Sequence, residues 1–239
     1  MNVLIVYAHP EPKSFNGAML ERAVRALEAQ GHAVEVSDLY AQGFNPVSGP
    51  HNFSALANPD FYKQQDEERH ASTTNGFAPD VQAEIEKLSR ADLLIFQFPL
   101  WWFSVPAILK GWVDRVFAFG VAYGDARWYD NGVFKGRRAM LSLTTGASQA
   151  MFSPRGMHGD IEQILFPIHH GMLAFVGFDV LPPFIAWSAS HGSDEERHEV
   201  LNRYEEQLRN WQNATPIAYH SLSDYDEEMQ MKEGLPALQ

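Results

Sequence analysis

The first segment that could do chemistry is the loop after the apolar N-terminal run of residues 2–8. Residues 8–17 read AHPEPKSFNG and open a helix. Free backbone N–H groups at a helix start, with Ser14 and Asn16 as added donors, favour a phosphate or pyrophosphate. A plain capped turn is the alternative. The chain has neither G-x-G-x-x-G nor G-x-x-x-x-G-K-[ST], which argues against a Rossmann dinucleotide site or a P-loop.

A second segment, residues 98–106, reads FPLWWFSVP. Consecutive loop residues cannot all face one interior, so Trp101, Trp102 and Phe103 are hard to explain by core packing alone. Their rings could wall in a flat heterocycle while the backbone hydrogen-bonds its edge. The alternative is an apolar lid over the end of the sheet.

A third segment, residues 144–148, reads TTGAS, and its small residues would let the backbone approach a ligand closely. His158 follows in GMHGD, where the flanking glycines allow an unusual backbone conformation just before a helix start. A single histidine is more often structural than catalytic, so His158 is a candidate only in combination with the other loops.

The elements that must position these loops alternate between strands and helices. We expect strands at 2–8, 33–39, 92–98, 139–144 and 179–187, with helices after Ser14, from about Asp80, at Pro106 and from about Asp160. A last helix, with acids in its first turn, places Val200, Leu201, Tyr204, Leu208 and Trp211 on one stripe. This order predicts an α/β fold with a doubly wound, five-stranded parallel sheet, whose ligands bind beyond the carboxyl ends of the strands. Residues 41–79 form a long insertion, and 120–136 an irregular or hairpin excursion.

Composition excludes several classes of function. The 239 residues include no cysteine, so thiol chemistry, disulfides and Cys-ligated metals are ruled out, and any redox chemistry needs a bound cofactor. Thirty acidic against 18 basic residues give a net charge of −12, which disfavours nucleic acid and anionic membranes as partners. The N-terminus does not resemble a signal peptide and no stretch predicts a membrane span, so we expect a cytoplasmic protein.

Several segments, in the same order over residues 2 to about 217, carry a family resemblance. They are YAHP at 7–10 with SFN at 14–16, FQFPLWWF at 96–103 with VPAILKGW at 105–112, TTG at 144–146, MHGD at 157–160, and Pro216. Together they resemble the NAD(P)H:quinone oxidoreductases of the DT-diaphorase type. The block from FPLWWF to KGW is specific to that family.

The resemblance implies a flavodoxin-like homodimer with FAD in a site at the dimer interface. Residues 9–16 would match the loop around the pyrophosphate and ribityl chain, residues 99–103 and 144–147 would border the isoalloxazine, and Arg197 would lie near the adenine. The predicted cofactor-binding residues are His9, Ser14, Phe15, Asn16, Pro99, Leu100, Trp101, Trp102, Phe103, Thr144, Thr145, Gly146, Ala147, Phe152 and Arg197.

The same resemblance implies the reaction. NADH or NADPH would give a hydride to flavin N5, and a quinone would then use the same slot, giving ping-pong kinetics. His158 matches the family histidine that stabilises negative charge growing on the N1–C2=O side of the flavin. The predicted substrate slot comprises Trp102, Phe103, Tyr123, Asp125 and His158.

Two positions depart from the family pattern. Phe152 stands where the family pairs its histidine with a tyrosine, so one hydroxyl donor is missing. Asp125 stands where the family has a second gating tyrosine, and its carboxylate near the slot could repel acidic substrates.

The predicted function is therefore two-electron reduction of quinones by a flavoenzyme. The alternatives are an azo- or nitroreductase on the same scaffold and a flavin-bearing regulatory subunit of a potassium efflux system, and FMN could replace FAD. We expect a flavin-binding domain at 1–217 and an acidic tail at 218–239. His169 and His170 point about 100° apart on a helix, so we predict no metal site.

Overall fold

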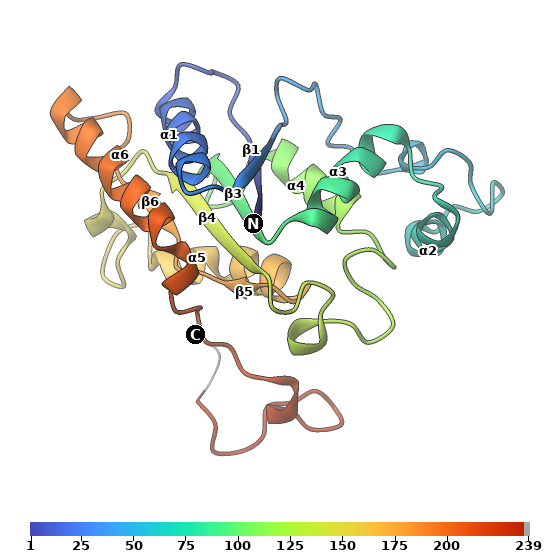
Figure 1. Ribbon diagram of the computed structural model, residues 1–239. Helices are drawn as coiled ribbons and strands as arrows, with labels where there is room; N and C mark the ends of the chain where they lie inside the picture. The colour runs from blue at the N-terminus through green and yellow to red at the C-terminus, as the bar shows by residue number, and fades with distance from the viewer. Residues whose placement is uncertain (237–239) are drawn as a thin grey trace.

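A computed structural model describes residues 1–236, and its centre is one parallel sheet (Figure 1). The strand order is β2-β1-β3-β4-β5, and β6 also pairs with β4. The strands are β1 (Asn2–Tyr7), β2 (Ala33–Asp38), β3 (Leu93–Pro99), β4 (Arg138–Thr144), β5 (Asp179–Val180) and β6 (Phe184–Ala186). Every pairing is parallel, and the order reverses direction beside β1, which confirms the predicted doubly wound sheet.

The edge position of the sheet is divided between two short strands. The sequence predicts one strand over 179–187, whereas β5 ends at Val180 and β6 begins at Phe184. Pro182 and Pro183 lie between them and have no N–H to donate to a ladder, so the pairing is interrupted there. Both strands pair with β4.

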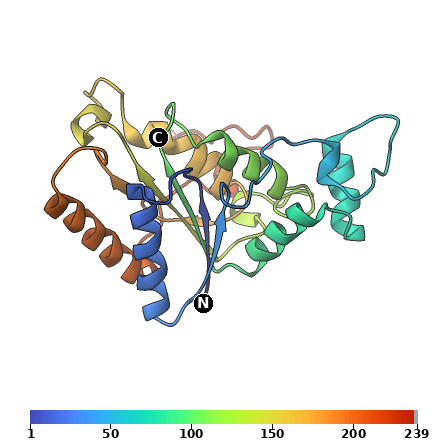
Figure 2. The same cartoon turned by 90° about the horizontal axis from the view of Figure 1, so that it is seen from above.

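Helices cover both faces of the sheet. The helices are α1 (Phe15–Ala29), α2 (Gln64–Thr74), α3 (Pro79–Arg90), α4 (Ala107–Val116), α5 (Ile161–Ile168) and α6 (Asp194–Arg209), with a π-helical turn at His169–Ala174 after α5. Helix α2 belongs to the insertion and lies away from the strands (Figure 1). Seen from above, α1 and α6 lie on one side of the strands and α3 and α4 on the other (Figure 2). Each face of the sheet therefore has its own core.

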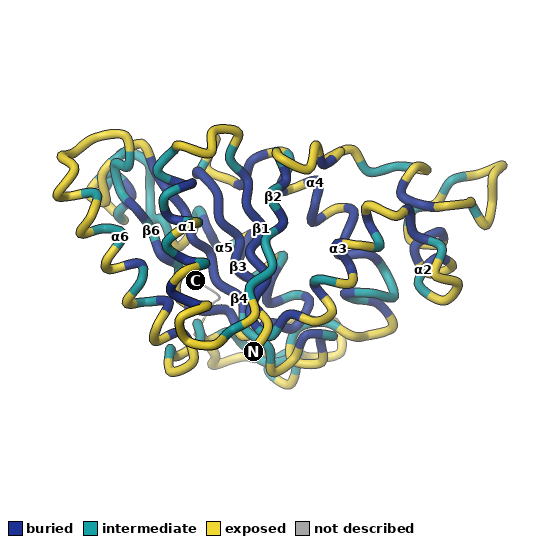
Figure 3. The backbone as a smooth tube through the Cα atoms, turned by 45° about the horizontal axis from the view of Figure 1, so that its top comes forward, coloured by how far each residue is buried: buried dark blue, intermediate teal, exposed yellow. Residues whose placement is uncertain are grey.

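The alternation of side chains along the strands supplies both cores. In β1, Val3 and Ile5 pack with α1 and α6, whereas Leu4 and Val6 pack with α3, α4 and α5. The strands β1, β3 and β4 are buried along almost their whole length, as expected for a sheet covered on both faces, whereas the edge strand β2 is mostly half-buried (Figure 3). Trp112 of α4 is fully buried in the second of these cores.

The 41–79 insertion contains a helix that the sequence pattern did not predict. Helix α2 is polar overall, so no apolar stripe marks it, and it ends at Asn75 in a left-handed conformation. The rest of the insertion is held to α4 by the buried Arg115, which donates to Asn52 Oδ1 at 2.7 Å and to the Asn45 carbonyl oxygen at 2.8 Å. Tertiary contacts, not local periodicity, order this segment.

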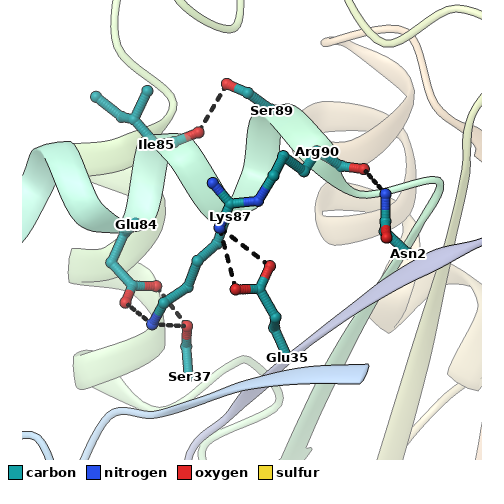
Figure 4. Close-up of polar contacts among 8 residues, drawn as sticks. All are labelled: Asn2, Glu35, Ser37, Glu84, Ile85, Lys87, Ser89 and Arg90. Atoms are coloured by element: carbon teal, nitrogen blue, oxygen red, sulfur yellow. Dashed lines mark hydrogen bonds and ion pairs between the residues drawn. The ribbon is translucent and has the colours of Figure 1, made fainter. Parts of the chain in front are cut away.

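A buried carboxylate fixes α3 against the sheet (Figure 4). Glu84 accepts hydrogen bonds from Ser37 of β2 at 2.6 Å, from Lys87 at 2.7 Å and from the indole of Trp112 at 2.8 Å. The three donors satisfy a charge that would otherwise be costly to bury. Nearby, Arg90 pairs with Glu35 at 3.0 Å on the surface.

The chain after α6 follows the outside of the domain. Ile217 donates its N–H to the Val180 carbonyl oxygen at 2.8 Å, and a short hairpin joins Tyr225 to Met231. The predicted tail extends to residue 239, and its last three residues lie outside the described part of the chain. Among residues 1–236, no helix is long and apolar enough to cross a bilayer.

Candidate functional site

The three candidate loops leave the sheet at neighbouring strand ends. The register pairs Tyr7 with Gln97 and Pro99 with Thr144, so β1, β3 and β4 end at one edge. Two further bonds continue the ladder into the loops: Ala8 N–H to the Gln97 carbonyl oxygen and Leu100 N–H to the Thr144 carbonyl oxygen, both at 2.9 Å. The predicted meeting of the loops therefore occurs, because parallel strands present their carboxyl ends together.

The first loop is a tight turn closed against α1. Ser14 is the N-cap of α1, and its hydroxyl accepts the N–H of Gly17 at 3.1 Å. A Cβ on Gly17 would lie 1.9 Å from the Pro12 carbonyl oxygen, so only glycine permits this approach. His9 accepts the Glu11 N–H on Nδ1 at 3.0 Å, and its ring lies 6.4 Å from that of Trp101.

Asn16 joins the first loop to the end of β4. Its amide nitrogen donates to Thr144 Oγ1 at 2.8 Å, and the residue is only 3% exposed. The amide oxygen Oδ1 is buried and has no hydrogen-bond partner among residues 1–236. Thr144 Oγ1 already accepts a hydrogen bond, so its own proton is available. The site thus has an acceptor and a donor side by side.

The second loop is a two-residue turn bracketed by Trp101 and Ser104, which exchange backbone hydrogen bonds. Trp102 and Phe103 both have positive φ, at 51° and 59°, which is costly for bulky side chains. Trp102 is 95% exposed, and Trp101 and Phe103 are also exposed. Strain together with exposed rings is typical of a binding surface and not of a core.

His158 lies in an aromatic cluster beside that turn. Its ring centroid is 5.5 Å from Phe103 and 4.9 Å from Phe152. Phe152, which is buried, also contacts Trp187 at 5.7 Å. Sequence reasoning missed Trp187, and its place at the end of an expected strand was the one signal that pointed to it. The cluster brings the second loop, the region after β4 and the end of β6 together.

A hollow of about 360 Å³ continues from Trp187 along the start of α6. Phe15 and Arg197, two of the predicted cofactor-binding residues, both line it. Thr145 and Ala147 are close by, since their carbonyl oxygens accept the N–H groups of Ala189 and Ser188. A Cβ on Gly146 would meet no atom within 4 Å, so the backbone there faces open space.

A larger hollow, of about 1030 Å³, runs beside β6 between α5 and α6. It shares Trp187 and Arg203 with the smaller hollow but includes none of the predicted site residues. We therefore build the site on the smaller hollow and the loop cluster, where the polar and aromatic groups converge.

Tyr123 and Asp125 lie with the insertion instead of with this cluster. Tyr123 accepts a hydrogen bond from Gln65 of α2 at 3.1 Å and packs against Phe175 at 5.8 Å. Asp125 forms an ion pair with Arg69 of α2 at 3.7 Å. Within residues 1–236, no ring contact joins Tyr123 to Phe103, Phe152 or His158. In the described part of the chain, Tyr123 and the cluster around His158 therefore belong to separate groups of ring contacts.

Comparison with known proteins agrees with this architecture. Residues 1–209 match the family model described as flavodoxin-like fold. NAD(P)H dehydrogenase [quinone] 1 of Cavia porcellus is 45% identical over 224 residues, covering 93% of this chain and 82% of that protein. The chain belongs to the NAD(P)H:quinone oxidoreductase family. The resemblance inferred from the sequence motifs is thereby confirmed.

Two further members of the family are similar over nearly their full length. Ribosyldihydronicotinamide dehydrogenase [quinone] of Mus musculus is 45% identical over 216 residues, or 90% of this chain and 94% of that protein. The crystal structure of a candidate quinone reductase from Klebsiella pneumoniae superposes with a TM-score of 0.95 at 39% identity. The superposition covers 100% of this chain and 98% of the Klebsiella pneumoniae chain.

The site residues fit the flavin that such a fold implies. The unpartnered Asn16 Oδ1 and the Thr144 hydroxyl suit a hydroxylated chain, which offers donors and acceptors. The open space at Gly146 admits a ligand close to the backbone. The exposed rings of residues 101–103 suit the face of a flat heterocycle.

Proposed function

We propose that this protein binds FAD and reduces quinones by two electrons at the expense of NADH or NADPH. The observation that carries the proposal is the juxtaposition of the strained, exposed Trp102–Phe103 turn with His158, next to the Asn16–Thr144 pair. A bound flavin supplies a ring that accepts a hydride and then gives it up. The names of the two curated relatives, both quinone dehydrogenases, support this choice of substrate.

In this proposal, the residues of the three loops have different roles. Asn16 and Thr144 hold the polar chain of the cofactor through the free acceptor and donor described above. Trp101, Trp102 and Phe103 cover one face of the flavin ring and exclude water from that side. His158 lies beside Phe103 and donates a hydrogen bond where negative charge develops.

FAD is favoured over FMN because the site continues beyond the loops. The hollow lined by Phe15 and Arg197 extends along α6 and offers a ring and a cation to the adenine and pyrophosphate. Heating the purified protein and identifying the released flavin by mass tests this. We expect FAD, and release of FMN alone would contradict this part of the proposal.

A homodimer would complete the substrate slot. Trp102 and Met157 are 95% and 87% exposed at the site, while Tyr123 and Phe175 pack together elsewhere on the same chain. A second copy can bring its Tyr123 to the first copy's Trp102, forming an isologous interface. Light scattering should give twice the chain mass, and Trp102→Glu should shift it toward the monomer.

A steady-state assay tests the reaction. Because the nicotinamide and the quinone would occupy the same slot in turn, we expect parallel double-reciprocal lines when both substrates are varied. The assay should use NADH and NADPH with a panel of quinones, nitroaromatics and azo dyes. Faster turnover of azo dyes or nitroaromatics than of every quinone would favour the azo- or nitroreductase alternative. A colourless protein that takes up no added flavin would overturn the proposal.

A further inference from the structure

A fully buried chain of hydrogen bonds runs beneath the candidate site. Gln97 of β3 donates from its amide nitrogen to the Asn16 carbonyl oxygen at 2.6 Å. Its amide oxygen accepts the hydroxyl of Tyr204, on α6, at 3.3 Å. Gln97 and Tyr204 are both completely inaccessible to solvent. The series of hydrogen bonds continues to the end of β4, where the Asn16 amide nitrogen donates to Thr144 Oγ1.

The Gln97 amide in this chain of hydrogen bonds has a fixed orientation. A carbonyl oxygen can only accept, so the Gln97 nitrogen must face Asn16 and its oxygen must face Tyr204. Burial raises the pKa of the Tyr204 phenol, which therefore stays protonated as the donor. Asn16 in turn directs its nitrogen to Thr144, which leaves Oδ1 as the free acceptor in the site.

Gln97 is a polar residue on the otherwise apolar face of β3 that packs against α1 and α6. Leu93 and Ile95 share the face and pack in the core with α1 and α6. A buried amide costs free energy unless its groups are satisfied, and an aliphatic side chain would fill this position without that cost. The amide joins three elements at once: β3, the first turn of α1 and the middle of α6.

Both helices that the amide joins also line the candidate cofactor site. Asn16 is in the first turn of α1, and α6 carries Arg197 two turns before Tyr204. A shift of the Asn16 backbone would move its free acceptor and the Thr144 hydroxyl bonded to it. Small displacements matter here because hydrogen bonds weaken steeply away from their preferred geometry.

We propose that Gln97 and Tyr204 are positioning residues for the flavin, which hold the Asn16 acceptor and the Thr144 hydroxyl in the geometry that the cofactor's polar chain requires. This inference rests on the proposed function, since it assumes that a flavin occupies the site. Neither residue touches the ligand, and both act through Asn16.

The test is flavin affinity measured on the full chain after the bound flavin has been removed. Tyr204→Phe deletes only the hydroxyl and keeps the buried ring. Quenching of flavin fluorescence gives the dissociation constants of riboflavin and FAD, and we expect both to rise about fivefold, the equivalent of one neutral hydrogen bond. Gln97→Met, which keeps the size and removes both bonds, should raise them further.

The matched control is Tyr219→Phe, which removes the hydroxyl of a half-buried phenol in the C-terminal segment, away from this chain of hydrogen bonds. It should leave both constants unchanged. If Gln97→Met does not fold, Tyr204→Phe still decides the question, because thermal melting reports whether that variant keeps its core.

Each pattern of binding has a distinct meaning. Loss of affinity for riboflavin and FAD alike supports the proposal, because riboflavin has the ribityl chain but no adenine. Loss for FAD alone would place the effect on α6 and overturn the role assigned to Asn16. Unchanged affinity for both flavins would overturn the proposal and leave the flavoenzyme intact. A wild-type protein that binds neither flavin would overturn both.

Discussion

The rings of Phe152 and His158 lie 4.9 Å apart, with their planes inclined by 47°. Phe103 contacts both rings and Trp187 contacts Phe152, so Phe152 is packed against three rings. His158 therefore faces an apolar neighbour, and its backbone N–H donates to the Met151 carbonyl oxygen at 2.9 Å. At this position the family pattern has a tyrosine, so the proposed site has one side-chain hydrogen-bond donor fewer.

Phe152→Tyr should restore the second donor and speed the reductive half-reaction. A hydroxyl beside His158 would stabilise developing negative charge, for an increase of about three- to tenfold. Stopped-flow reduction of the protein-bound flavin by NADH or NADPH measures the rate. Phe166→Tyr, at a half-buried ring on α5, is the control. An unchanged or lower rate in Phe152→Tyr would show that the missing hydroxyl is not limiting.

Gly17→Ala should weaken both the fold and flavin binding. The added methyl would lie 1.9 Å from the Pro12 carbonyl oxygen and would push the first loop away from α1, at a cost of about 2 kcal/mol. Thermal melting and flavin titration measure the two effects. In contrast, Gly171→Ala places a methyl in open space within a helical turn and should be neutral or slightly stabilising. Equal behaviour of the two variants would contradict the steric argument.

The Arg69–Asp125 pair should set how the enzyme treats charged acceptors. Arg69 also lies over the ring of Phe119 at 4.4 Å, so it is held beside Asp125 and partly neutralises it. The repulsion of acidic substrates expected from Asp125 alone is thereby reduced. If this loop borders the slot, Arg69→Gln should lower kcat/KM for a sulfonated quinone about two- to fivefold, and Asp125→Asn should raise it. A neutral quinone serves as the control, and parallel changes for both acceptors would refute the electrostatic explanation.

His169 should make the protein less stable in mild acid. Burial lowers the pKa of its imidazole from 6.5 to about 4, so the folded state binds the proton less tightly than the unfolded state. Its contribution is fully present above pH 6.5 and is lost as the pH falls toward 4, by up to about 3 kcal/mol. Urea unfolding from pH 7 to 4 should therefore show a shallower decline for His169→Leu. His191→Asn, at an exposed histidine, should follow the wild type, and identical slopes for all three proteins would exclude His169 as the cause.

The sequence by itself determined the sheet, the order of the three loops and the family. Continuous apolar runs and the Ser14 cap are local signals, and parallel strands bring their carboxyl ends together wherever such runs alternate with helices. The pairing of Asn16 with Thr144 and of Phe103 with His158 follows from that topology. The sequence motifs identified these residues as candidates, but they did not predict which atoms of the Asn16 amide form hydrogen bonds.

Only the tertiary structure decided how the remaining groups are used. Helix α2 has no apolar stripe, so its contacts through Gln65 and Arg69 with Tyr123 and Asp125 could not be inferred from periodicity. Gln97 was one polar residue in a buried strand, and its role depends on Tyr204, 107 positions away. Contacts over such separations leave no local pattern, because they are fixed by which elements pack together and not by the neighbours of each residue in the chain.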